Sequence, residues 1–146
     1  MKKRAKMIFL ICSVRGATKE EAAIAGAYVK DLEDKGNKVH WPPRDTDQKD
    51  NRGLRICNDN CEAIMRADEI HILWNPASQG SLFDFGMAFI LRRLHEKKIV
   101  LANFKSVLPT PEKSFTNVVM DIHTMDNIVR KGVDKKTSWV CIQPCW

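Results

Sequence analysis

Short apolar runs alternate with longer segments of helical periodicity along the 146-residue chain. Continuous apolar runs are typical of strands that are covered on both faces of a sheet. Such runs, or shorter strand-like segments, occupy residues 7–14, 38–41, 69–74, 97–104 and 138–143. Apolar residues recur at the spacing of one helical face in residues 18–35, 54–66, 81–95 and 114–130. Predicted strands and helices therefore follow one another from end to end.

This alternation predicts the fold class. Strands that alternate with helices favour a mostly parallel sheet with helices on both faces, joined by right-handed crossovers. A chain of 146 residues without an internal repeat fits one domain. We therefore predict a single domain over residues 1–146 with a basic tail at residues 1–6. Its architecture is three-layer α/β/α around a mostly parallel, five-stranded Rossmann- or flavodoxin-like sheet.

Local signals place the ends of the first helix. Thr18 is a candidate N-cap, with Glu20 and Glu21 in the turn behind it. Gly36 and Asn37 are typical of a helix end. The helix is therefore expected to fill the space between these two signals.

Other segments are predicted from composition and periodicity. Residues 42–53 are polar and rich in turn formers, which predicts a loop, and residues 76–80 predict a turn. Apolar residues nearly surround the helix over 81–95, which predicts that it is well buried. The helix over 114–130 has a candidate break near His123.

Composition and charge restrict the class of protein and the location that we expect for it. The chain is 44% hydrophobic and 29% charged, as expected of a globular protein, and no apolar run reaches the roughly 18 residues that a membrane span needs. The basic start and the short apolar stretch after it are interpreted as a tail and a first strand, not as a signal peptide. We therefore expect a cytoplasmic protein without membrane contact. The net charge is +6, but four basic residues lie within the first six positions. No specific nucleic-acid surface is therefore implied.

The five cysteines have two interpretations. Cys57 with Cys61, and Cys141 with Cys145, form two pairs with three residues between their members, and Cys12 lies in an apolar run. Two such pairs could supply a four-thiolate zinc site, but the usual tight C-x2-C spacing is absent. Reduced, packed cysteines explain the pattern better, and we expect no metal.

Three polar segments are expected to meet at one edge of the sheet. In open α/β sheets, ligands bind beyond the carboxyl ends of the strands. Residues 13–18, 41–52 and 74–84 each follow a predicted strand and carry polar side chains. The functional site is therefore predicted among them.

Residues 13–18, with the sequence SVRGAT, have the features of an anion site. The segment joins a strand to a helix start, where free backbone N–H groups and the helix dipole favour an anion. Arg15 can bind phosphate through two parallel hydrogen bonds, Ser13 can add a hydroxyl group, and Gly16 lets the backbone approach closely. A plain loop with an ordinary cap would look similar, and the segment matches neither a P-loop nor G-x-G-x-x-G.

Asp84 is the second candidate. It lies among Leu82, Phe83 and Phe85 at the opening of a predicted helix, so its carboxylate should be strongly desolvated. A carboxylate in such surroundings is a candidate nucleophile or general acid or base. The alternative is an acid that interacts with the helix dipole in the first turn.

The order of these segments resembles the nucleoside 2-deoxyribosyltransferase family. The segments that carry the resemblance are RADEIHILW, SQGSLFDFGMAF and KKIVLA. The start, FLICSVRGATKEEAAIAGAYVKDLEDKG, is most similar to the branch of nucleoside 5′-monophosphate N-glycosidases, which includes the deoxynucleotide N-hydrolases. The resemblance covers about residues 7–104. Its most specific parts are Ser-x-Arg-Gly and the spacing from Ser78 to Asp84.

The resemblance implies roles for individual residues. Asp84 falls at the position of the catalytic glutamate. Asn60 falls near an aspartate that touches the sugar or orients the nucleophile, and a shift of one residue would instead place Asp59 there, on a different face of the helix. Ser13, Arg15 and Gly16 fall where the branch holds the 5′-phosphate. Further residues are implied near the substrate: Phe9 beside the base and sugar, Ser78 as a serine lent to the phosphate site of a neighbouring subunit, and Gly80 in the turn before the helix.

Two loop residues are weaker candidates. Trp41 could stack on a base or simply anchor its loop. Asp45 could touch the sugar or be a solvated loop acid.

The resemblance implies an enzyme that hydrolyses, or transfers, the N-glycosidic bond of a nucleoside 5′-monophosphate. Such an enzyme needs no cofactor and forms a homodimer or larger homo-oligomer with shared sites. Two departures favour an alternative, in which a catalytically weakened module of the same fold binds or senses a nucleotide. Asp84 is one methylene shorter than glutamate, and reaction geometry is sensitive to such a change. Asn60 replaces a second carboxylate, which changes the electrostatic surroundings of the nucleophile.

Overall fold

Four parallel strands form one sheet in the computed structural model, which describes residues 4–129. The strands are β1 (Met7–Ile11), β2 (Lys38–His40), β3 (Glu69–Ile72) and β4 (Lys98–Leu101). Their spatial order is β2-β1-β3-β4. In the register of the sheet, Phe9 lies opposite His40 on one side and Ile70 on the other, and Ile70 in turn faces Ile99. The all-parallel pairing confirms the predicted α/β class and is compatible with a Rossmann-like fold.

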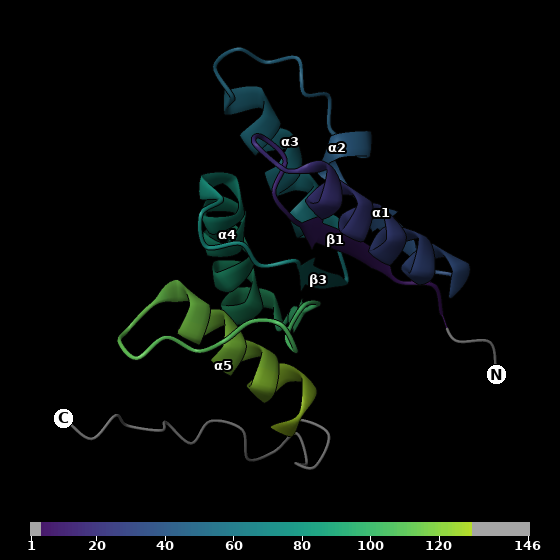
Figure 1. Ribbon diagram of the computed structural model, residues 1–146. Helices are drawn as coiled ribbons and strands as arrows, with labels where there is room; N and C mark the ends of the chain where they lie inside the picture. The colour runs from purple at the N-terminus through teal and green to yellow at the C-terminus, as the bar shows by residue number, and fades with distance from the viewer. Residues whose placement is uncertain (1–3, 130–146) are drawn as a thin grey trace.

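Five helices complete the described chain. They are α1 (Lys19–Asp34), α2 (Pro42–Asp45), α3 (Leu54–Arg66), α4 (Gln79–His95) and α5 (Phe115–Asn127). α1 packs on one face of the sheet, while α3, α4 and α5 contribute to the core on the other face (Figure 1). The predicted helical layers on both faces are therefore present.

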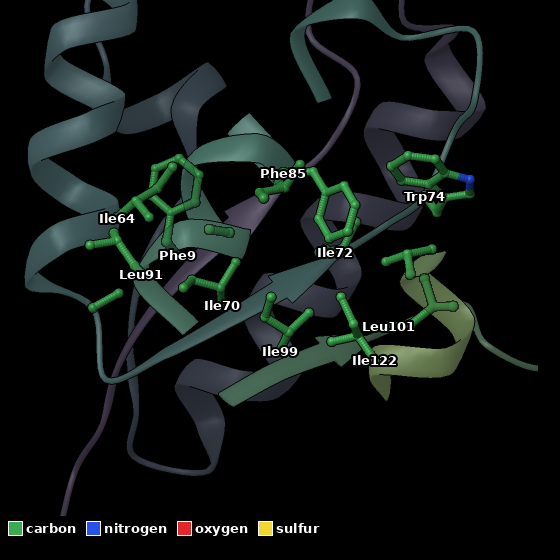
Figure 2. Packing of buried hydrophobic residues seen from close by; sticks show 14 of the residues in the cluster. Phe9, Ile64, Ile70, Ile72, Trp74, Phe85, Leu91, Ile99, Leu101 and Ile122 are labelled. Atoms are coloured by element: carbon green, nitrogen blue, oxygen red, sulfur yellow. The ribbon is translucent and has the colours of Figure 1, made fainter. Parts of the chain in front are cut away.

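The two cores follow from the alternation of side chains along each strand. Ile8 and Leu10 of β1 point to the α1 face and pack with Val29. Phe9 and Ile11 point to the opposite face and join the larger cluster. Figure 2 shows this cluster, in which residues from three strands meet residues from α3, α4 and α5. Strands with apolar residues on both faces read as continuous apolar runs, which is why the sequence pattern located them.

The predicted helix signals of α1 are confirmed. The Thr18 hydroxyl accepts from the Glu21 backbone N–H at 3.0 Å, and the Glu21 carboxylate accepts from the Thr18 backbone N–H at 2.8 Å. This reciprocal capping box satisfies two backbone donors at the helix start. At the other end, Gly36 adopts a φ of +84°, a left-handed conformation that glycine adopts without steric penalty.

The structure differs from three of the predictions about helices. Residues Pro42–Asp45 form a short helix within the expected loop, because proline is well suited to the first helical turn. α4 begins at Gln79, so the expected turn over 76–80 ends earlier. α5 runs unbroken through His123.

The prediction that α4 is well buried is wrong for the single chain. Phe83, Ile90 and Leu94 are 56%, 52% and 67% exposed. The helix uses a different face, which includes Asp84 and Phe85, to pack on the protein.

The predicted fifth strand at residues 138–143 lies outside the described residues and stays a prediction. Among residues 4–129, no helix combines the length and the apolar character required to cross a membrane.

Candidate active site

The strand order places a topological switch point between β1 and β3. From β1 the chain continues to β2 on one side, whereas β3 lies on the other side. The loops that leave β1 and β3 therefore diverge at the carboxyl edge of the sheet, which is where ligands bind in open α/β folds. Hydrogen bonds join these loops, since Asn75 Nδ2 donates to Ser13 Oγ at 3.1 Å and to Glu21 Oε1 at 2.9 Å. This edge carries the candidate site.

Asp84 is a buried carboxylate at this edge. It lies in the second turn of α4 and is 8% exposed. Burial raises its pKa to about 7, and a hydrogen bond from Asn60 Nδ2 to Asp84 Oδ2 at 3.2 Å opposes part of this rise. Near neutral pH the group is therefore divided between its acid and its base form, as expected of a carboxyl group used in proton transfer.

Cys12 shows that Asp84 lies close to the end of β1. Burial raises the pKa of the Cys12 thiol to about 11, while the neighbouring Trp41 side chain lowers it and the negative charges of Asp84 and Glu21 add to the rise. Cys12 directly precedes Ser13 in the chain. The carboxylate of α4 and the loop after β1 therefore belong to one region.

The loop after β1 keeps the features of an anion site. Arg15 is exposed and forms no ion pair within residues 4–129. Gly16 adopts a φ of +76°, and the Ala17 backbone N–H closes a turn onto the Val14 carbonyl at 3.3 Å. The Ser13 hydroxyl accepts from Asn75, so its own proton remains available for a ligand.

Ser78 and Gly80 lie at the start of α4. The Ser78 hydroxyl is the helix N-cap and accepts from the Ser81 backbone N–H at 3.2 Å. Gly80 is an exposed residue of the first turn, and a Cβ placed there would meet no atom within 4 Å. Both residues stand one turn or more before Asp84, but the backbone does not require glycine at position 80.

The structure gives three predicted substrate contacts, Phe9, Trp41 and Asp45, partners within the protein. Phe9 is 0% exposed and stacks on His40, with ring centroids 5.2 Å apart, so it packs behind the site and does not line it. Trp41 is partly buried and packs against α1 near Gly26, so loop anchoring explains it. The Asp45 carboxylate accepts from the Trp41 backbone N–H and the Arg44 guanidinium, at 2.8 and 2.9 Å. Its oxygens therefore serve α2 and the adjacent ion pair.

Sequence reasoning missed three polar residues that hydrogen bonds link to Ser13 or Asp84, directly or through other side chains. Asn75 directly follows the β3 segment, and this position was the signal that could have found it. Thr46 is 4% exposed, and its hydroxyl donates to Asn60 Oδ1 at 2.9 Å. His40 Nε2 lies 2.8 Å from the same hydroxyl. Thr46 lies in the polar segment 41–52 that was predicted to reach the site, but its bond to Asn60 and the contact of His40 with Thr46 depend on the tertiary fold.

The structure describes three of the five cysteines, and each of the three is a free thiol. Cys57 and Cys61 are free thiols on α3, and residues 4–129 contain no group of three or more potential ligands that could hold a metal ion. Cys141 and Cys145 lie outside the described residues.

The sequence matches no protein-family model, and no curated protein matches it significantly. Support for a function therefore comes from the geometry of the site and from the resemblance read from the sequence.

Proposed function

We propose that this protein cleaves the N-glycosidic bond of a nucleoside 5′-monophosphate, with Asp84 as the nucleophile. The observation that carries the proposal is a buried carboxylate at the switch point of a parallel sheet, beside a loop that has the features of an anion site. The resemblance to the monophosphate N-glycosidases supports the same assignment. Within this proposal the protein belongs to that branch and acts in the cytoplasm.

The proposed reaction has two steps. Asp84 attacks C1′ of the sugar as the base leaves with the electron pair of the glycosidic bond, and the leaving base takes up a proton from solvent water. The developing positive charge on the sugar is stabilised by the nearby carboxylate. Water then attacks C1′ of the glycosyl-enzyme and gives up a proton to solvent, and the bond from C1′ to Asp84 breaks to release sugar phosphate and the carboxylate, as in retaining glycosidases. A second base in place of water would give transfer, and neither route needs a metal or redox cofactor.

The 5′-phosphate is assigned to the loop after β1. Arg15 supplies charge and two parallel donors, while Ser13 and the backbone at Gly16 supply further donors. The hydrogen bonds from Asn75 to Ser13 and Glu21 hold this loop against the start of α1. A held loop binds an anion with less loss of conformational entropy.

The second candidate is a nucleotide-binding module without turnover. Three properties of Asp84 favour a binding module: its short side chain, its low exposure and its pKa of about 7. Together they limit the reach and the ionisation of a nucleophile. In this case the same site would bind or sense the nucleotide.

We also propose a homodimer with shared sites. Phe83, Ile90 and Leu94 are exposed on α4 at intervals of seven and four residues, which places them on one helical face. Exposed apolar faces of this kind mark association surfaces, and twofold pairs are the commonest closed assembly. The position of Ser78 at the start of the same helix supports a site that the two subunits share.

A base-release assay tests the activity. The protein is incubated with a panel of ribo- and deoxyribonucleoside 5′-monophosphates, and free base is followed by chromatography. We expect release that is lost in Asp84→Asn and that increases with pH through about 7, since only the ionised carboxylate attacks. Tight nucleotide binding without release, in both forms, would support the binding module and contradict the enzyme.

A further inference from the structure

Four polar side chains form a continuous hydrogen-bonded chain that ends at Asp84. His40 Nε2 lies 2.8 Å from Thr46 Oγ1, Thr46 Oγ1 donates to Asn60 Oδ1 at 2.9 Å, and Asn60 Nδ2 donates to Asp84 Oδ2 at 3.2 Å. Thr46, Asn60 and Asp84 are 4%, 7% and 8% exposed. Water therefore has little access to the inner links, and a lost partner would not be readily replaced.

The single proton of the Thr46 hydroxyl fixes the direction of this chain. Because that proton is donated to Asn60, the Thr46 oxygen has to accept from His40, which requires a hydrogen on His40 Nε2. The Asn60 carbonyl is then engaged by Thr46, and its NH₂ group is turned toward Asp84. A reversed amide would donate from its NH₂ group to the Thr46 oxygen and set the Asn60 carbonyl against the ionised carboxylate, so the hydrogen bond to Asp84 would be lost.

We propose that Thr46 and His40 are positioning residues for Asp84, because they hold the Asn60 amide in the orientation that donates to the carboxylate. The His40 ring is itself held by its parallel stacking on Phe9, with an interplanar angle of 13°. This gives the buried Phe9 an indirect part in the site. The use of the oriented carboxylate as a nucleophile rests on the proposed function, whereas the orientation itself does not.

The test is an NMR titration of the Asp84 carboxyl carbon in the full chain. In Thr46→Val the Asn60 amide loses its orienting donor and its hydrogen bond to the ionised form weakens, so the measured pKa of Asp84 should rise by roughly half a unit to one unit. Thr46→Ser should restore the original value. Thr124→Val, which removes a hydroxyl bonded to the Met120 carbonyl of α5, should leave it unchanged.

A second measurement needs no variant. Nitrogen NMR of neutral His40 should show the hydrogen on Nε2. A hydrogen on Nδ1 would overturn the proposal, since the Thr46 proton would then be donated to His40 and not to Asn60. His40→Phe keeps a ring against Phe9 and removes the Nε2–H donor. Like Thr46→Val, it should raise the pKa of Asp84.

The outcomes separate this inference from the proposed function. An unchanged Asp84 pKa in folded Thr46→Val overturns the positioning role, even if the protein releases base. The predicted pKa changes in a protein that releases no base support the positioning role and contradict the proposed activity.

Discussion

At the scale of single residues, burial of the ionised Asp84 carboxylate lowers the stability of the folded protein. Its pKa is about 7 in the folded protein and near its ordinary value in the unfolded chain, so the folded state binds the proton more tightly. Stability therefore falls as pH rises from about 4 to about 7, and it stays lower above that range. A buried group that destabilises the fold in this way is typical of a functional site.

Asp84→Asn should accordingly stabilise the protein at high pH. The amide has the same shape and no charge, so we expect the free energy of unfolding to increase by roughly 2 to 4 kcal/mol at pH 8 and by little at pH 4. Denaturant unfolding at the two pH values measures this difference. An equal effect at both would show that the carboxylate is not destabilised by burial.

Arg15→Ala should weaken binding of nucleotides but not of nucleosides. Loss of two charge-assisted hydrogen bonds predicts a roughly 10- to 100-fold rise in Kd for a nucleoside 5′-monophosphate. Arg66→Ala, at an exposed arginine in the last turn of α3, is the matched control. Isothermal titration calorimetry measures the affinity of each variant for the 5′-monophosphate and for the free nucleoside. Equal affinities of the unsubstituted protein for the two ligands would contradict the assignment of this loop to phosphate.

At the scale of elements, the sequence predicted what is encoded locally. The α1 cap at Thr18 and the end at Gly36 depend on neighbouring residues, and both are confirmed. The exposed side of α4 was not predictable, because an apolar residue at position 90 is buried or exposed according to which elements pack around it. The helix at Pro42 was missed because turn formers and a first helical turn share the same composition.

Two glycines next to the site should respond in opposite ways to alanine. Gly16→Ala places a side chain at a φ of +76°, so we expect it to lower the free energy of unfolding by about 1 kcal/mol. Gly80→Ala adds a Cβ in open space within α4, where alanine is favoured by up to about 1 kcal/mol. Thermal unfolding of the two variants measures both changes in stability. If Gly16→Ala were as stable as the unsubstituted protein, the loop would not need its left-handed turn.

At the scale of the whole molecule, the sheet order brings together segments that lie far apart in the sequence. The sequence predicted that residues 13–18 and 74–84 meet at one edge, and Asn75 joins them through Ser13. The resemblance supplied the candidate Asn60, which contacts Asp84. The chain from Asn60 through Thr46 to His40 could not be predicted, because it depends on how β2 and α3 pack.

The proposed homodimer has its own test. Ile90→Glu places a charge on the exposed apolar face of α4, so we expect it to shift the mass measured by light scattering from dimer to monomer. Ile24→Glu, at a position on α1 that is 52% exposed, should leave the dimer intact. Equal dissociation by both variants would show that α4 is not the specific interface.

The most direct measurement is a crystal structure of Asp84→Asn with a bound nucleoside 5′-monophosphate. We predict the phosphate against Arg15 and the backbone of residues 13–18, with C1′ within about 3.5 Å of the side chain at position 84. A nucleotide whose phosphate lies away from Arg15, or whose sugar cannot reach position 84 in any arrangement of subunits, would contradict the account.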